Sequence, residues 1–156
     1  MSGVEGRIAA LGHELPTVAA PLAAYVPALR SGNLIFTSGQ LPTRNGELAY
    51  TGIVGRDVTP EDAKLAAEIC ALNAIAAVKS VVGNLDNVRR VVKIVGFVAS
   101  DPSFTAQPGV INGASELLLA VFGDAGKHAR SAVGVAALPI NAPVEVELIV
   151  EVDHMA

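Results

Sequence analysis

One stretch near the end of the chain contains residues that could bind a small organic anion. Residues 128–139 read His-Ala-Arg-Ser-Ala-Val-Gly-Val-Ala-Ala-Leu-Pro, and Arg130 is the only lysine or arginine in this small, apolar, strand-like run. A guanidinium presents a planar fork of N–H donors, which a carboxylate fits best. The stretch therefore predicts either a structural ion pair, with Glu145 or Glu147 as the acid, or a binding site for a carboxylate ligand.

This stretch and a second one upstream resemble a known family. Residues 130–139, followed by Val-Glu-Val-Glu at residues 144–147, are similar to the signature of the RidA/YjgF family of reactive-intermediate deaminases. Residues 33–42, Asn-Leu-Ile-Phe-Thr-Ser-Gly-Gln-Leu-Pro, resemble that family's first hairpin. The resemblance covers about residues 25–152 and consists of several separated motifs in the right order.

The resemblance implies a reaction and a set of site residues. Family members hydrolyse reactive enamines and imines, released from amino acids by pyridoxal-phosphate enzymes, to 2-keto acids and ammonia. In that chemistry Arg130 would hold the substrate carboxylate as a bidentate, charge-assisted pair, with Ser131 and the backbone N–H of Ala132 beside it. Glu145 matches the acid near the reacting water, where a carboxylate can activate the water and stabilise positive charge on nitrogen. The other matching pocket residues are Tyr25, Ser38, Gly39 and Asn112.

Plainer roles stay open for several of these residues. From residue types alone, Tyr25 fits the rim of a domain, Gly39 a strand bulge, and Asn112 a polar helix start. Ala132, Gly134 and Ala137 are small here, where the family often has a cysteine, an acid and a basic residue. These departures indicate a diverged branch of the family.

Three alternatives to a deaminase therefore stay open. The chain could be a non-catalytic binder or sensor of small carboxylates. It could be an endoribonuclease or translation inhibitor, as some family members are described. It could also be a scaffold in which Arg130 pairs with Glu145 across subunits.

Composition narrows the classes of function. The chain has 156 residues, 51% of them hydrophobic, and a mean hydropathy of +0.49, which fits one domain with a substantial core and favours burial against a copy of itself. A net charge of −4 and 4% aromatic residues argue against nucleic-acid binding. Cys70 is the only cysteine and the three histidines are scattered, so we expect no disulfide, metal or cofactor. We also expect no membrane span and a cytoplasmic protein.

The residue pattern divides the chain into an N-terminal helical extension and connector, residues 1–20, and a single domain, residues 21–156. Within residues 1–15, Val4, Ile8 and Leu11 follow helical spacing, and Pro16 to Pro27 indicates an extended connector. In the domain we expect the following elements: a strand at 34–38, a turn at Asn45-Gly46 with a return strand at 48–50, a helix at 60–82, a strand at 87–100, a helix at 108–122, a strand from Arg130, and a strand at 144–152.

This order predicts an α+β fold with two helices packed on one face of a mixed sheet. The resemblance implies the chorismate-mutase-like version of that fold. It also implies a homotrimer with a central barrel, sites at the subunit interfaces, and the acidic side of the last strand turned toward the centre.

Overall fold

The structure is a computed structural model that describes residues 3–18 and 24–154. The predicted start of the first helix at Met1 and part of the predicted connector lie outside these residues. The elements are α1 (Val4–Ala10), β1 (Ala28–Ser31), β2 (Leu34–Thr37), β3 (Thr43–Arg44), β4 (Glu47–Leu48), α2 (Pro60–Val82), β5 (Val88–Ala99), α3 (Gln107–Phe122), β6 (Ala129–Val135) and β7 (Val144–Val152), with three short 3-10 turns at Leu85–Asn87, Gly123–Gly126 and Pro139–Asn141.

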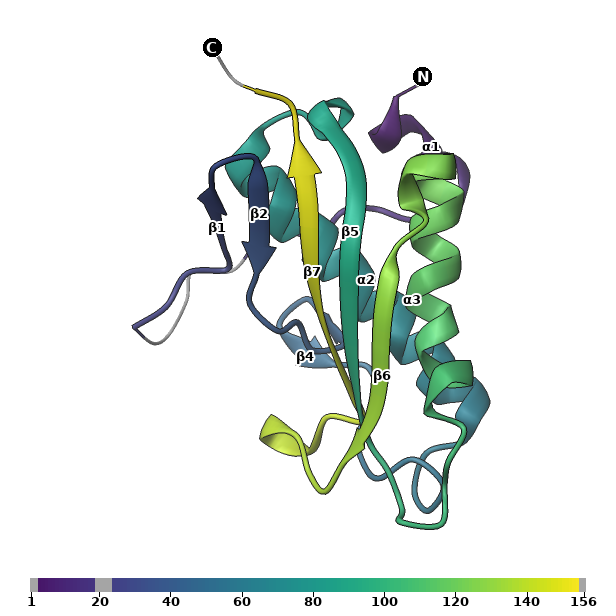
Figure 1. Ribbon diagram of the computed structural model, residues 1–156. Coiled ribbons are helices and arrows are strands. Elements are labelled where there is room, and N and C mark those ends of the chain that lie inside the picture. Colours follow the sequence, from purple (N-terminus) through teal and green to yellow (C-terminus); the bar gives the residue numbers. More distant parts are fainter. Residues whose placement is uncertain (1–2, 19–23, 155–156) are drawn as a thin grey trace.

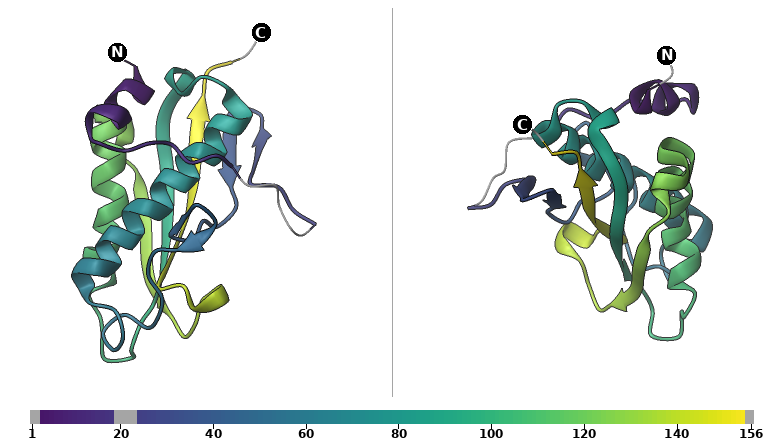
Figure 2. Two further views of the ribbon diagram at one scale, coloured as in Figure 1. Left: turned by 180° about the vertical axis from the view of Figure 1, so that it is seen from behind. Right: turned by 45° about the horizontal axis from the view of Figure 1, so that its top comes forward.

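The main sheet has the strand order β1-β2-β7-β5-β6. Strands β5 and β6 pair in parallel, while the other neighbours are antiparallel. Helices α2 and α3 lie together on one face of this sheet, as both views in Figure 2 and the view in Figure 1 show. The predicted α+β fold, with a mixed sheet and two helices on one face, is therefore confirmed.

Local signals set the bounds of the long helix α2. The Thr59 hydroxyl accepts a hydrogen bond of 3.1 Å from the Asp62 backbone N–H, Pro60 occupies the first turn, and Gly83 ends the helix with a φ of 76°. By length and composition α2 could cross a membrane, but most of its apolar stretch is buried within the domain. The many alanines of α2 instead allow close packing, and Gly113 of α3 sits directly against the backbone of Lys64.

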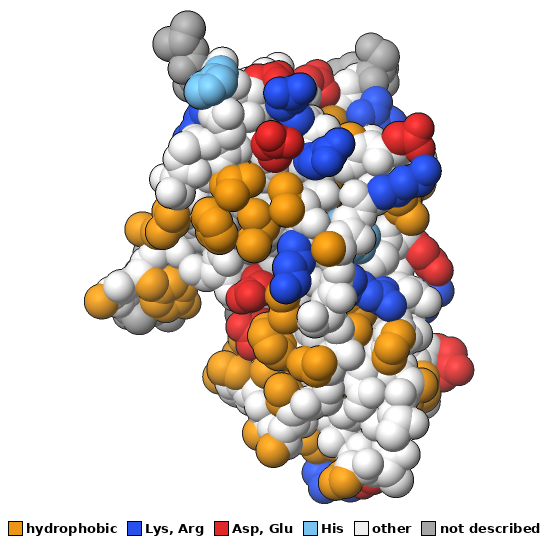
Figure 3. All heavy atoms as spheres, in the orientation of Figure 1, with side chains coloured by type: hydrophobic (Ala, Val, Ile, Leu, Met, Phe, Trp, Pro, Cys, Tyr) orange, Lys and Arg blue, Asp and Glu red, His pale blue; other side chains and the backbone are white. Residues whose placement is uncertain are grey.

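No helix of the described residues covers the other face of the sheet, and we call it the open face. Along β7 the alternate residues Val144, Val146, Leu148 and Val150 are buried under the helices, as predicted. The residues between them are only partly buried and point to the open face: Glu145, Glu147, Ile149 and Glu151. Figure 3 views this face and shows hydrophobic patches with acidic and basic side chains between them.

Two predictions about the first part of the domain are wrong. The sequence analysis missed β1, which forms a hairpin with β2 around Gly32. The Asn45-Gly46 turn exists, with positive φ at both residues, but its return strand β4 pairs with the two-residue β3 and not with β2. The signal for a turn was local, whereas the choice of its strand partner was not.

The N-terminal helix is anchored to the domain. Val4 and Ile8 are buried, and the Val4 backbone N–H donates to Asp86 Oδ1 at 2.8 Å. Leu11, which we expected on the same stripe, is 46% exposed. The segment that follows α1 runs across the outer side of α2 (Figure 2, left).

Candidate functional site

Arg130 lies on β6, the edge strand of the sheet, and its side chain reaches toward α3. Its Nη1 donates to Asn112 Oδ1 at 2.8 Å and to Ser115 Oγ at 3.2 Å. Both acceptors are neutral, and none of the ion pairs within residues 3–18 and 24–154 involves Arg130. The structural ion pair with Glu145 or Glu147 is therefore not formed within one subunit. In the described part of the chain, Nε and Nη2 of Arg130 have no hydrogen-bond partner, so they can serve a ligand.

The backbone of β6 adds a second donor on the same edge. The Ser100 N–H donates to the Val135 carbonyl at 3.3 Å, so the backbone groups of Val135 point toward β5. Because the backbone groups of a strand alternate in direction, those of Arg130 and Ala132 point away from β5, toward solvent. The N–H of Ala132 is thus presented at the edge that carries Arg130. The side chain of Ser131 is exposed on the open face and does not join this group.

Glu145 lies on the opposite face of the sheet from Arg130. Arg130 is paired with Ile94, which is fully buried under the helices, whereas Glu145 is paired with Phe97 on the open face. With β5 between the two strands and three residues of offset, strand spacing puts their Cα atoms about 14 Å apart. The two residues therefore cannot meet on one small substrate within a single subunit.

Glu145 has its own group of neighbours. Its carboxylate lies directly against Gly39, where a Cβ atom would overlap Oε1. Burial, and to a lesser degree the nearby Glu147, raises the pKa of Glu145. Ser38 binds the chain ahead of β1: its hydroxyl donates to the Val26 carbonyl at 2.6 Å, and the neighbouring Tyr25 is 58% exposed.

Seven of the eight predicted site residues therefore form two groups rather than one pocket, and Ser131 lies outside both groups. We call Arg130, Asn112 and the Ala132 N–H, together with Ser115, the arginine half-site. We call Glu145, Gly39, Ser38 and Tyr25 the glutamate half-site. The first lies at the β6 edge of the sheet, and the second lies on the open face toward β2 and β7, on the other side of β5.

Two residues at the arginine half-site were missed by the sequence analysis. Ser115 Oγ lies 2.9 Å from Nε2 of His128, and Nδ1 of His128 lies 2.6 Å from the Gly126 carbonyl. Ser115 follows Asn112 by three residues, a spacing that puts both side chains on one face of a helix. That spacing could have identified Ser115, whereas His128 needed the fold.

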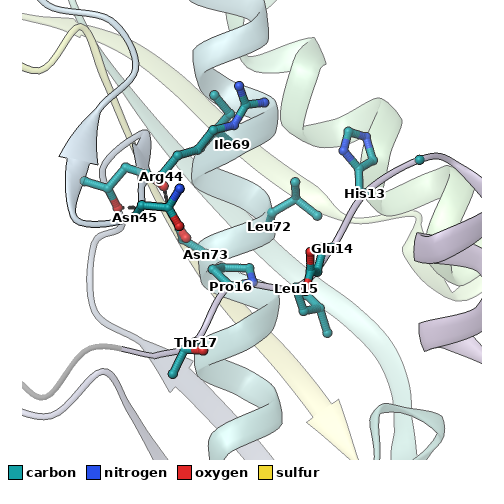
Figure 4. A pocket seen from close by; sticks show the side chains of 12 residues that line it. His13, Glu14, Leu15, Pro16, Thr17, Arg44, Asn45, Ile69, Leu72 and Asn73 are labelled. Carbon is teal, nitrogen blue, oxygen red and sulfur yellow. Dashed lines mark hydrogen bonds between the residues drawn. The ribbon is translucent and has the colours of Figure 1, made fainter.

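Two cavities in the described part of the chain lie away from both half-sites. One, of about 440 Å³, is enclosed by residues 12–17, the β3–β4 hairpin and the outer side of α2, with Arg44, Asn45 and Asn73 along its wall (Figure 4). The other, of similar volume, lies where β5 and β6 end, beside Gly134. Neither of these two cavities is lined by Arg130 or Glu145. Within the described residues no three His, Cys, Asp or Glu side chains are grouped to hold a metal.

A protein-family model matches residues 5–152 of the chain, and its description reads "YjgF/chorismate_mutase-like, putative endoribonuclease". The chain belongs to this YjgF/chorismate mutase-like family. Protein TCP17 of Trypanosoma cruzi, a curated relative, is 47% identical over 154 residues, with 96% of each chain covered. Membership of the family and the chorismate-mutase-like fold, both predicted from the sequence, are therefore confirmed.

Solved structures agree with this assignment to the YjgF family. Protein Atu1372 of Agrobacterium tumefaciens is 53% identical and superposes with a TM-score of 0.91, covering 97% of this chain and 94% of that one. RidA from an Antarctic Psychrobacter bacterium is 28% identical with a TM-score of 0.61, covering 87% of this chain and 94% of its own. The chain is thus similar to a RidA protein over most of its length and closer in structure to Atu1372.

Proposed function

We propose that this protein hydrolyses 2-imino acids, and the enamines in equilibrium with them, to 2-keto acids and ammonia in the cytoplasm. The observation that carries the proposal is the hydrogen bonding of the Arg130 guanidinium. Among residues 3–18 and 24–154 its Nε and Nη2 have no acceptor and lie beside the outward Ala132 N–H, while neutral acceptors on α3 hold Nη1. Three donors around one positive charge suit a carboxylate. The similarity to a RidA protein supports the same choice of substrate.

The reaction needs a base that can also return a proton. Water adds to the carbon of the protonated imine as Glu145 takes one of the water protons, which gives a neutral carbinolamine. Glu145 then gives this proton to the nitrogen, the C–N bond breaks to release ammonia, and Glu145 takes the hydroxyl proton and passes it to solvent, which leaves the 2-keto acid. A carboxyl with a raised pKa suits both steps, because it gives up a proton at a pH closer to neutrality. No step calls for a metal or an organic cofactor.

The proposed site is completed by two subunits. The arginine half-site lies at the β6 edge and the glutamate half-site lies on the open face over β7, so head-to-tail association of copies brings the arginine half-site of one against the glutamate half-site of the next. Such heterologous contacts close into a ring when the rotation allows it. We propose a homotrimer in which the open face, with its exposed Leu29, Phe36 and Val133, lines a central barrel.

A coupled assay tests this function. An enzyme that generates 2-iminopropionate is mixed with the protein, and pyruvate release is followed. We expect wild-type protein and an Arg89→Ala control, altered at an exposed arginine outside both half-sites, to accelerate release. We expect Arg130→Ala to lose the acceleration, because the substrate carboxylate has lost its cation.

The same samples separate the rival functions. Binding of 2-ketobutanoate through Arg130 without any acceleration would indicate a carboxylate sensor and contradict the deaminase. RNA cleavage at physiological salt that is lost in Arg130→Ala would indicate an endoribonuclease, which the net charge of −4 disfavours.

A further inference from the structure

A chain of hydrogen bonds runs from the backbone to the Nη1 end of the Arg130 guanidinium. It links the Gly126 carbonyl to His128, His128 to Ser115 Oγ, and Ser115 Oγ to Arg130 Nη1, at 2.6, 2.9 and 3.2 Å. We propose that Ser115 and His128 are positioning residues that fix which edge of the Arg130 guanidinium meets the substrate carboxylate. This inference rests on the proposed function.

The partners determine the direction of each hydrogen bond. The Gly126 carbonyl can only accept, so Nδ1 of His128 carries a hydrogen and donates it. In the neutral imidazole Nε2 is then an acceptor, and it takes the hydroxyl hydrogen of Ser115. With its hydrogen directed at His128, Ser115 Oγ turns its lone pairs to Arg130 Nη1. His128 therefore acts on Arg130 through the hydroxyl orientation of Ser115.

The arrangement leaves one edge of the guanidinium for the ligand. Nη1 has two hydrogens, and its two acceptors, Asn112 Oδ1 and Ser115 Oγ, stand about one turn apart on α3. The remaining donors, on Nε and Nη2, form the side-on fork that matches the two oxygens of a carboxylate. The structure thus assigns side-on binding, with the Ala132 N–H beside it on the same strand edge.

Substitution of His128 should disturb this arrangement although His128 itself does not contact the ligand. The Ser115 hydroxyl would then lack its acceptor and could turn its hydrogen to Asn112 Oδ1, where it competes with Arg130 Nη1. Loss of Ser115 removes one of the two Nη1 acceptors directly. In both cases the guanidinium gains freedom to rotate away from the side-on orientation, which weakens the carboxylate contact in ground state and transition state alike.

Calorimetric titration with 2-ketobutanoate tests the inference on the full-length protein. The loss of one hydrogen bond predicts a Kd about two- to tenfold higher for Ser115→Ala. His128→Ala should raise Kd in the same direction, and the double variant should equal Ser115→Ala alone, because His128 acts only through Ser115. Ser115→Thr, which keeps the hydroxyl, should bind as wild type, and so should His13→Ala, a control at a histidine paired with Glu68 on another element.

Steady-state kinetics distinguish a positioning role for Ser115 from a purely structural one. In the coupled assay we expect KM to rise in Ser115→Ala with kcat nearly unchanged, because the enzyme binds the substrate and the transition state more weakly by the same amount. Wild-type affinity in Ser115→Ala, with binding lost in Arg130→Ala, would overturn the positioning role and leave the proposed function standing. Additive effects of the two substitutions would also overturn it. Unchanged affinity in Arg130→Ala would instead overturn the proposed function itself.

Discussion

Mixing two inactive variants tests whether each site draws on two subunits. Arg130→Ala removes the cation of the arginine half-site, and Glu145→Gln removes the charge of the glutamate half-site. In the proposed trimer, each variant on its own then lacks one group at every subunit boundary. In a mixed trimer, an Arg130→Ala subunit still supplies Glu145 and its neighbour still supplies Arg130, so an intact site forms where they meet in the right order.

The size of the recovery follows from the separation of Arg130 and Glu145 on opposite faces of one subunit. In an equal mixture, half of the subunits carry the intact arginine and half carry the intact glutamate, so about one quarter of the boundaries of a cyclic assembly are complete. After joint refolding, native mass spectrometry identifies mixed trimers and the coupled assay measures turnover. We expect about one quarter of the wild-type rate per subunit. A rate no higher than that of the separate variants, in a sample with mixed trimers, refutes the shared site.

Three further substitutions test the surroundings of the half-sites. Burial and Glu147 raise the pKa of Glu145, so the stability contributed by this residue is full below the ordinary glutamate pKa and is lost as pH rises through the pKa in the folded protein. Glu145→Gln should therefore raise Tm at neutral pH but not at acid pH. An equal Tm shift at every pH from 3 to 8 in thermal scans contradicts this. Gly39→Ala should lower turnover with little change in Tm, because the new methyl group displaces the end of the Glu145 side chain; wild-type kcat would show that this contact is unimportant. Gly113→Ala should lower the free energy of unfolding by about 1–3 kcal/mol, since its Cβ would overlap the Lys64 carbonyl, and an unchanged urea midpoint would disprove the close packing.

The helices could be predicted because their signals are local. Thr59 and Pro60 at the start of α2, and Gly83 at its end, each act within one turn of the helix and need no tertiary partner. The alternation along β7 was equally local, so its buried and open sides were predicted correctly. The short β1 gave no such signal, because Ala28–Ser31 contains neither alternation nor a β-branched residue.

The layout of the site could not be predicted because it depends on strand order. Arg130 and Glu145 lie on two strands that follow one another in the chain, but β5 is inserted between β6 and β7. Register across β5 then decides that the two side chains point to opposite faces. His128 could be associated with Arg130 only through Ser115, and that link requires the packing of α3 on the sheet.

A crystal structure with bound 2-ketobutanoate tests the central claim most directly. The account predicts its carboxylate against Nε and Nη2 of Arg130 and the Ala132 N–H, with the keto carbon facing Glu145 of an adjacent subunit. A carboxylate bound elsewhere, or Arg130 paired with an acid of a neighbouring subunit and closed to the ligand, would contradict it.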